Sequence, residues 1–189
     1  MSVKTDIMQQ DKSKLMSFAM QGGIFLGIFW VVKYFSVVVY GANASTMLQF
    51  VQPILSAFTA VILFQNLIKY RVFVLNNVMS FWHGVQFSIM LFFFASLFES
   101  VAAFIHITWI DPQYVSAMYA SMVDLLKTFN INESVITSFE SQPIPDGLGY
   151  IVNHVILSDI LIGIMLSLLL VPISKMINPK NITTNQSEK

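Results

Sequence analysis

Four long apolar segments constrain this chain more than any other feature of its sequence. They lie at about residues 15–39, 47–68, 81–109 and 147–171. A helix needs roughly 20 consecutive apolar residues to cross the hydrocarbon core of a bilayer, and each segment reaches that length. Only 11% of the 189 residues are charged, whereas a soluble domain carries about 25%. The sequence therefore predicts an all-α integral membrane protein with four transmembrane helices.

The segments outside these helices divide the rest of the chain. Residues 1–14 are polar, and residues 179–189 form a second polar segment. We expect the four-helix membrane domain to span residues 15–178. Its one sizeable loop covers residues 110–146, where apolar residues recur at helical spacing opposite polar ones. This loop is predicted to form amphipathic helices that contact either the membrane surface or the end of the bundle.

Short signals predict where helices begin and end in this part of the chain. Asp111, followed by Pro112, is expected to cap the first loop helix. Asn130, followed by Glu133, is expected to cap the second. Pro172 is expected to close the fourth transmembrane helix, because proline cannot donate a backbone hydrogen bond. The loop that connects the third and fourth spans should therefore contain two helices.

The basic residues predict how the helices are oriented. With a cytoplasmic N-terminus, the inner segments carry all but two of the ten lysines and arginines, namely Lys4, Lys12, Lys14, Lys69, Arg71, Lys175, Lys180 and Lys189. The loop 110–146 carries one lysine and five acidic residues. Such a bias places both termini in the cytoplasm and the loop outside. In this orientation Lys69, Tyr70 and Arg71 are expected to anchor the second span at the inner interface.

Several motifs carry a resemblance to a known family. Met79-Ser80-Phe81 precedes the third span, Ile110-Asp111-Pro112-x-Tyr114 follows it, and Leu161 to Leu168 lies in the fourth, before the basic Lys175. With these motifs in this order, residues 14–178 resemble a family of four-span inner-membrane proteins of Bacteroidota, called domain of unknown function 4199. The resemblance implies a bacterial inner membrane and adds no activity.

The polar residues inside the predicted spans are the candidate functional site. An ionisable side chain costs roughly 2.5–3.5 kcal/mol at the centre of a membrane helix. Counted along the helices, these residues lie in the outer half of the bilayer: Lys33, Glu99, His106, Asn153, His154 and Asp159. Glu99 and His106 are seven residues apart, so they share one face of the third span. We expect Lys33, Glu99 and Asp159 to meet in the bundle interior.

Two interpretations of this cluster remain open. Lys33 can form a structural ion pair with one carboxylate and so fix the helix register. Alternatively, two carboxylates near one lysine form a protonation site, with the two histidines relaying protons outward.

Small and aromatic residues predict how the helices pack. Gly22, Gly23 and Gly27 allow a close helix contact, and Asp159, Gly163 and Ser167 form a stripe that should face the other helices. The run 92–94 is all phenylalanine and points in three directions, so we expect it to contact lipid.

The sequence contains no motif typical of an enzyme. There is no cysteine and no nucleophile, metal or phosphate-binding signature. His154 and Asp159 are five residues apart, about 140° around an α-helix, and should not face each other. The formal net charge is +0, so the charge balance does not indicate a nucleic-acid partner. We therefore expect a non-enzymatic protein without cofactor or metal, whose partners are the lipid bilayer and either a second copy or another membrane protein. Its expected role is that of an accessory or assembly subunit, and the alternative is a small proton-linked transporter or channel component.

Overall fold

The computed structural model describes residues 2–43 and 46–177, with side chains from residue 12 onward except at 37, 39–50 and 52. All regular structure in these residues is helical. Following the chain, the elements are α1 (Ser2–Asn43), α2 (Thr46–Lys69), the π-helix η1 (Tyr70–Val74), α3 (Phe81–Ile105), the π-helix η2 (His106–Ile110), α4 (Tyr114–Thr128), α5 (Glu133–Glu140), α6 (Gly147–Tyr150), the π-helix η3 (Ile151–Ile156) and α7 (Leu157–Met176). Lys180, Lys189 and the predicted segment 179–189 lie outside the described residues.

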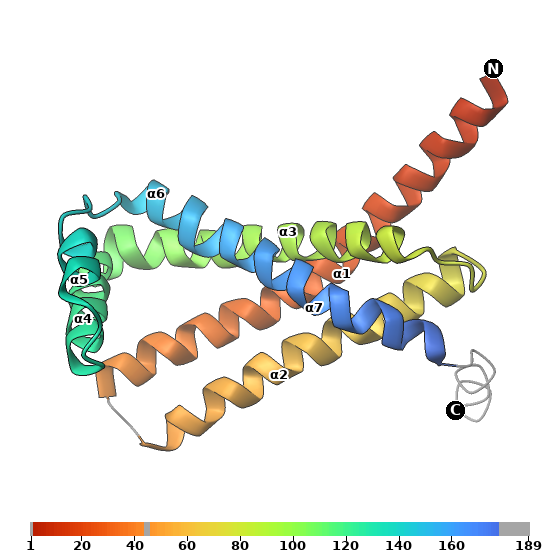
Figure 1. Cartoon of the computed structure of the whole chain (residues 1–189). Coiled ribbons are helices and arrows are strands. Elements are labelled where there is room, and N and C mark those ends of the chain that lie inside the picture. Colours follow the sequence, from red (N-terminus) through yellow and green to blue (C-terminus); the bar gives the residue numbers. More distant parts are fainter. Residues whose placement is uncertain (1, 44–45, 178–189) are drawn as a thin grey trace.

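The four predicted transmembrane helices are present. Four stretches of the described residues are long and apolar enough to cross a membrane: Lys12–Ser36, Pro53–Val74, Phe81–Ile110 and Gly147–Met176. Residues 2–14 of the predicted polar segment belong to α1, which is one continuous helix from Ser2. Its first turns project beyond the other helices in Figure 1.

The bundle has two different ends. The beginning of α1, the end of α7 and the turn between η1 and α3 lie together at one end, which we call the uncapped end (Figure 1). At the other end α4 and α5 lie side by side across the spans, and we call this the capped end. The turn at the uncapped end uses Asn76 and Asn77, which have positive φ angles of 48° and 69°. Asparagine tolerates this left-handed conformation better than most residues.

The closest helix contact joins α1 to α3 through glycines. A Cβ atom on Gly23 would lie 2.5 Å from Phe94 Cβ and 2.9 Å from the Leu91 carbonyl oxygen. A Cβ on Gly27 would lie 2.8 Å from Phe98 Cβ. These separations are shorter than any real Cβ contact, so the glycines form a specific packing face between two backbones.

The other helices pack on this pair through small and aromatic residues. On α7, Gly163 lies directly against the Phe92 ring, and Ser167 is fully buried, so the predicted stripe does face the bundle. Phe92 is also fully buried and packs edge-on against Trp30 of α1. The expectation that Phe92 contacts lipid is therefore wrong, although Phe93 is exposed. The Trp30 indole N–H donates to the Thr59 hydroxyl at 3.1 Å and so joins α1 to α2.

Arg71 does not anchor the chain at the membrane interface. Only 3% of its surface is exposed, and Tyr70 is completely buried. The Arg71 guanidinium donates to the carbonyl oxygens of Ser174 and, at 2.7 Å, of Ile177. The last carbonyls of a helix have no partner within it, and the planar guanidinium can bridge two of them. Arg71 therefore holds the end of α7 against η1, whereas Lys69 is exposed as predicted.

Pro172 does not end the fourth span. It lies inside α7, which continues to Met176. Proline removes one backbone donor, and the helix beyond it is held by Arg71 and by the Ser174 hydroxyl, which donates to the Val171 carbonyl at 2.7 Å. The predicted end was wrong because these contacts come from a distant part of the chain and from a side chain beyond the proline.

The two loop helices form where expected, but their predicted capping residues differ. Asp111 Oδ1 accepts from the Gln113 backbone N–H at 3.2 Å and so forms a turn before α4. Asn132, and not Asn130, caps α5, with Oδ1 accepting from the Ser134 N–H at 2.9 Å. Asn130 instead has a positive φ angle of 50° just after α4. Asparagine in this left-handed conformation is common just after the end of a helix, which is where Asn130 lies.

Candidate functional site

The three charged residues of the predicted cluster lie near one another inside the spans. Glu99 (α3) and Lys33 (α1) both lie within electrostatic reach of Asp159 (α7). Each of the three side chains is half-buried. Where side chains are described, however, the one ion pair is Lys127–Glu140 on the cap. Lys33 is therefore close to the two carboxyl groups without direct contact to either.

Polar atoms in this region are buried without hydrogen-bond partners. Asp159 Oδ2 and Ser100 Oγ are two of three such side-chain atoms in the described part of the chain. Ser100 directly follows Glu99 in α3. A buried polar group without a partner costs about 1–3 kcal/mol. The site thus retains unsatisfied polar atoms where a purely structural ion pair would satisfy them.

His106 is buried between the carboxyl groups and the cap. It is 2% exposed, and its Nδ1 shares a hydrogen bond of 2.8 Å with the Tyr34 hydroxyl. Its ring also lies edge-on to Tyr114 of α4, with ring centroids 4.9 Å apart. Burial raises the pKa of the Tyr114 phenol, and the nearby Asp111 carboxylate raises it further. Tyr114 therefore stays neutral and keeps its hydroxyl proton.

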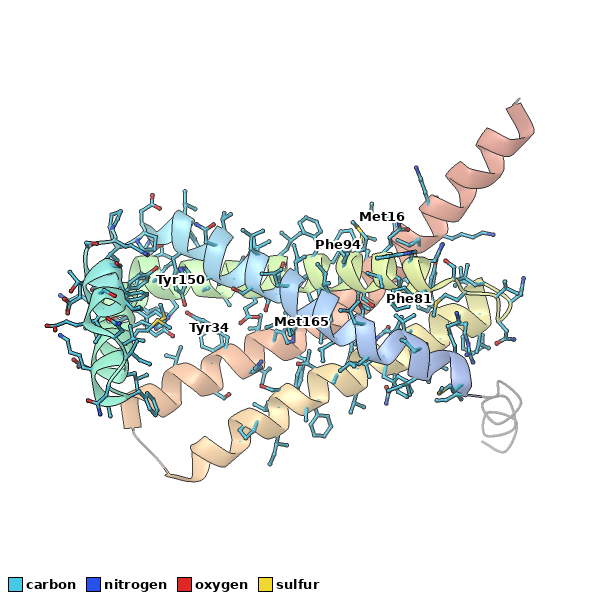
Figure 2. All side chains as sticks on the ribbon, in the orientation of Figure 1. Met16, Tyr34, Phe81, Phe94, Tyr150 and Met165 are labelled. Atoms are coloured by element: carbon cyan, nitrogen blue, oxygen red, sulfur yellow. The ribbon has the colours of Figure 1, made fainter. Side chains whose placement is uncertain are left out.

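His154 forms a second contact between the bundle and the cap. Its Nε2 shares a hydrogen bond of 2.9 Å with the hydroxyl of Tyr119 in α4. Its ring stacks on Tyr150 with centroids 5.3 Å apart. Figure 2 shows Tyr34 and Tyr150 lying near α4 at the capped end. His154 itself is exposed, as is the neighbouring Asn153. His106 is thus buried, whereas His154 is exposed.

Both histidines lie in π-helices. His106 begins η2, and His154 lies inside η3. The Ser158 hydroxyl donates to the carbonyl of Asn153, five residues earlier, at 3.3 Å. The α-helical geometry used to separate His154 from Asp159 by about 140° therefore does not apply across 151–156. π-helical turns are rare and are often found at functional sites.

The tyrosines are the site residues that sequence reasoning missed. Tyr34, Tyr114 and Tyr150 act electrostatically on one another, and Glu99 acts on both Tyr34 and Tyr150. Their positions in the sequence could have identified them, because each lies at about the same depth in its helix as a predicted site residue. Tyr34 follows Lys33 directly, and Tyr150 lies one turn before His154. We call these tyrosines and the two histidines the column; its tyrosines pack among buried apolar side chains between the carboxyl groups and the cap.

The arrangement offers proton donors and acceptors. No group of three or more histidine, aspartate and glutamate side chains in the described region is placed to hold a metal ion. The carboxyl, imidazole and phenol groups of the site are chemically able to donate and accept protons.

Fold and site together describe an all-helical chain with four helices long and apolar enough to cross a membrane, and with ionisable residues inside those helices. Residues 21–175 match the family described as Protein of unknown function (DUF4199), so the chain belongs to this family. No curated protein and no solved structure matches the chain.

Proposed function

We propose that this chain is a non-enzymatic protein of the bacterial inner membrane, as in Bacteroidota, that works as a small proton-linked transporter or channel component. The site of protonation is the carboxyl pair Glu99 and Asp159. In this proposal both termini are cytoplasmic, so the cap lies outside and the tyrosine–histidine column connects the pair to the outer surface.

One observation supports this function above the others. Asp159 Oδ2 is buried without a hydrogen-bond donor, although Lys33 and Glu99 lie nearby. Two half-buried carboxylates near one lysine are costly to ionise together, and a proton held by one of them relieves the repulsion. Its release needs an acceptor, and the Tyr34–His106 pair occupies the same column. Protonation of the pair thus changes the charge of the site.

Proton flux tests this proposal directly. The protein is reconstituted in vesicles containing a pH-sensitive dye, and the decay of an imposed pH gradient is followed. Wild-type protein should dissipate the gradient, while Glu99→Gln and Asp159→Asn should fall to the rate of protein-free vesicles and remain folded. Glu140→Gln removes an exposed carboxylate of the cap and should leave the flux unchanged. A wild-type rate equal to that of empty vesicles would overturn transport.

A second candidate, an accessory or assembly subunit, is favoured by the shape of α2. Its half near the uncapped end packs through buried Thr59, Leu63 and Leu67. No residue in 53–58 is buried, and Ile54 and Phe58 are more than half exposed. A partner membrane helix, or a second copy, would pack here. Crosslinking from a cysteine at position 54, compared with one at the lipid-facing position 165, distinguishes this role from transport by a single chain.

A further inference from the structure

A groove between α1 and α2 at the uncapped end has the chemistry of a lipid site. One part, with a volume of about 290 Å³, is lined by residues of α1 and α2 that include Phe18, Gln21, Phe25, Ile62, Gln65 and Lys69. The adjoining part, of about 470 Å³, shares Phe18 and Gln21 and reaches Lys14 and η1. The two parts adjoin at Phe18 and Gln21 and together extend along several turns of α1.

Two glutamines in this groove have no hydrogen-bond partner among the described residues. Gln21 lies nine residues inside the span Lys12–Ser36, and Gln65 lies nine residues inside Pro53–Val74. At about 1.5 Å per residue, both amides lie about 13 Å from the ends of their spans. Both side chains are exposed, and within the described residues neither is hydrogen-bonded to protein. An amide facing hydrocarbon without a partner is costly, so the groove requires a polar ligand at this depth.

The polar and apolar groups follow one order along the groove. Lys14 and Lys69 are exposed near its mouth, one to two helical turns closer to the uncapped end than the two glutamines. Phe25 and Ile62 lie on the far side of the glutamines, towards the middle of the membrane. A phospholipid has the same order: a charged phosphate, then ester carbonyls that accept hydrogen bonds, then acyl chains. Basic grooves between membrane helices bind anionic headgroups.

We propose that this groove binds an anionic phospholipid. The phosphate lies between Lys14 and Lys69, the amide N–H groups of Gln21 and Gln65 donate to the ester carbonyls, and an acyl chain covers Phe25 and Ile62. The site is separate from the carboxyl cluster under the cap, and it does not depend on proton transport.

Lipid retention measured by native mass spectrometry tests the headgroup. Protein is reconstituted with equal amounts of phosphatidylglycerol and phosphatidylcholine and extracted in detergent. Each lysine near a membrane surface contributes about 1 kcal/mol to anionic lipid binding, so two give a preference of about 30-fold. Lys14→Gln with Lys69→Gln should bring the two lipids near parity. Lys12→Gln with Lys175→Gln removes the same charge from exposed positions outside the groove and should keep the preference.

The role of the two glutamines is tested by removing either their amide groups or the ester carbonyls of the lipid. Gln21→Leu with Gln65→Leu should lower retention of both lipids, because both carry esters. An ether-linked phosphatidylglycerol, which lacks these carbonyls, should bind wild type as weakly as the ester lipid binds this variant. Equal retention of both lipids by wild type, or an equal loss in the Lys12/Lys175 control, would overturn the proposal. Displacement by soluble glycerol phosphate would mean that the site takes the free anion, and retention of no lipid at all would indicate a protein occupant.

Discussion

The two halves of the bundle each contain a tyrosine–histidine hydrogen bond, but in very different surroundings. Near the uncapped end, the Tyr70 hydroxyl and His83 Nε2 are 2.7 Å apart, and the Tyr70 ring stacks on Phe87 with centroids 4.4 Å apart. Near the capped end, the Tyr34–His106 pair lies among other tyrosines and close to Glu99. Both tyrosines pack in buried apolar clusters, and the second pair differs in lying within electrostatic reach of Glu99.

This difference indicates that the uncapped half mainly stabilises the bundle, whereas the capped half holds the groups able to exchange protons. The uncapped half joins its helices through glycine contacts, stacked rings and the Arg71 cap on α7. In the described residues, the capped half leaves Asp159 Oδ2 and Ser100 Oγ without partners and contains two of the three π-helices, whereas the uncapped half leaves Arg71 Nε without one and contains η1. Unsatisfied polar groups and irregular helix turns lower stability, and proteins retain them mainly at functional sites. Substitutions in the two halves should therefore differ in kind.

The largest effect is expected at the glycine contact. Gly23→Ala places a Cβ atom 2.5 Å from Phe94 Cβ, so α1 and α3 must separate. Overpacking of this kind costs about 3 kcal/mol. Gly147→Ala is the matched control, because its new Cβ would meet Ile107 at an ordinary 3.4 Å. Unfolding in mixed detergent micelles gives both free energies, and equal values would show that the contact is not specific.

A slightly smaller loss is expected from Arg71→Met. The change leaves the carbonyls of Ser174 and Ile177 without their donor in a buried place, which costs about 2–3 kcal/mol. Amide hydrogen exchange should show the last turn of α7 opening first. Arg71→Lys keeps the charge but not the planar fork, so it should restore only part of the stability. Lys175→Met changes an exposed side chain in the same turn, and a comparable loss there would contradict the capping role.

The two tyrosines test the comparison most directly. Tyr34→Phe and Tyr70→Phe each remove one hydroxyl bonded to a histidine, and each should lower the unfolding free energy by about 1 kcal/mol. Only Tyr34→Phe should also slow proton flux, because only Tyr34 lies close to Glu99. Equal loss of flux in both variants would mean that the flux reports overall stability and not the column.

The sequence was enough to predict the fold because the signals for it are local. Apolar length located the four spans, and apolar residues at helical spacing located α4 and α5. Gly163 and Ser167 were correctly placed on a packed face because helical spacing alone assigns them to one side of α7.

Other features depend on contacts between distant residues and could not be predicted. The basic and aromatic sequence around Arg71 is typical of an interface anchor. The Arg71 side chain is buried because it donates to a carbonyl oxygen more than 100 residues away. The π-helical turns around His106 and His154 shift the register that an α-helical count assumes. The tyrosines of the column come from three separate helices, so no spacing along the chain connects them.

The smallest effect is expected on the surface of the cap, at Lys127→Gln. Lys127 Nζ lies 2.8 Å from Glu140 Oε1 and joins α4 to α5, and this hydrogen bond raises the pKa of the Lys127 ammonium. The two side chains are 55% and 44% exposed, so water and salt screen their attraction. Melting temperature and proton flux should both equal those of wild type at low and high salt. A loss as large as that of Tyr34→Phe would mean that the α4–α5 contact helps to hold the column, and that the capped half depends on its surface as well as on its interior.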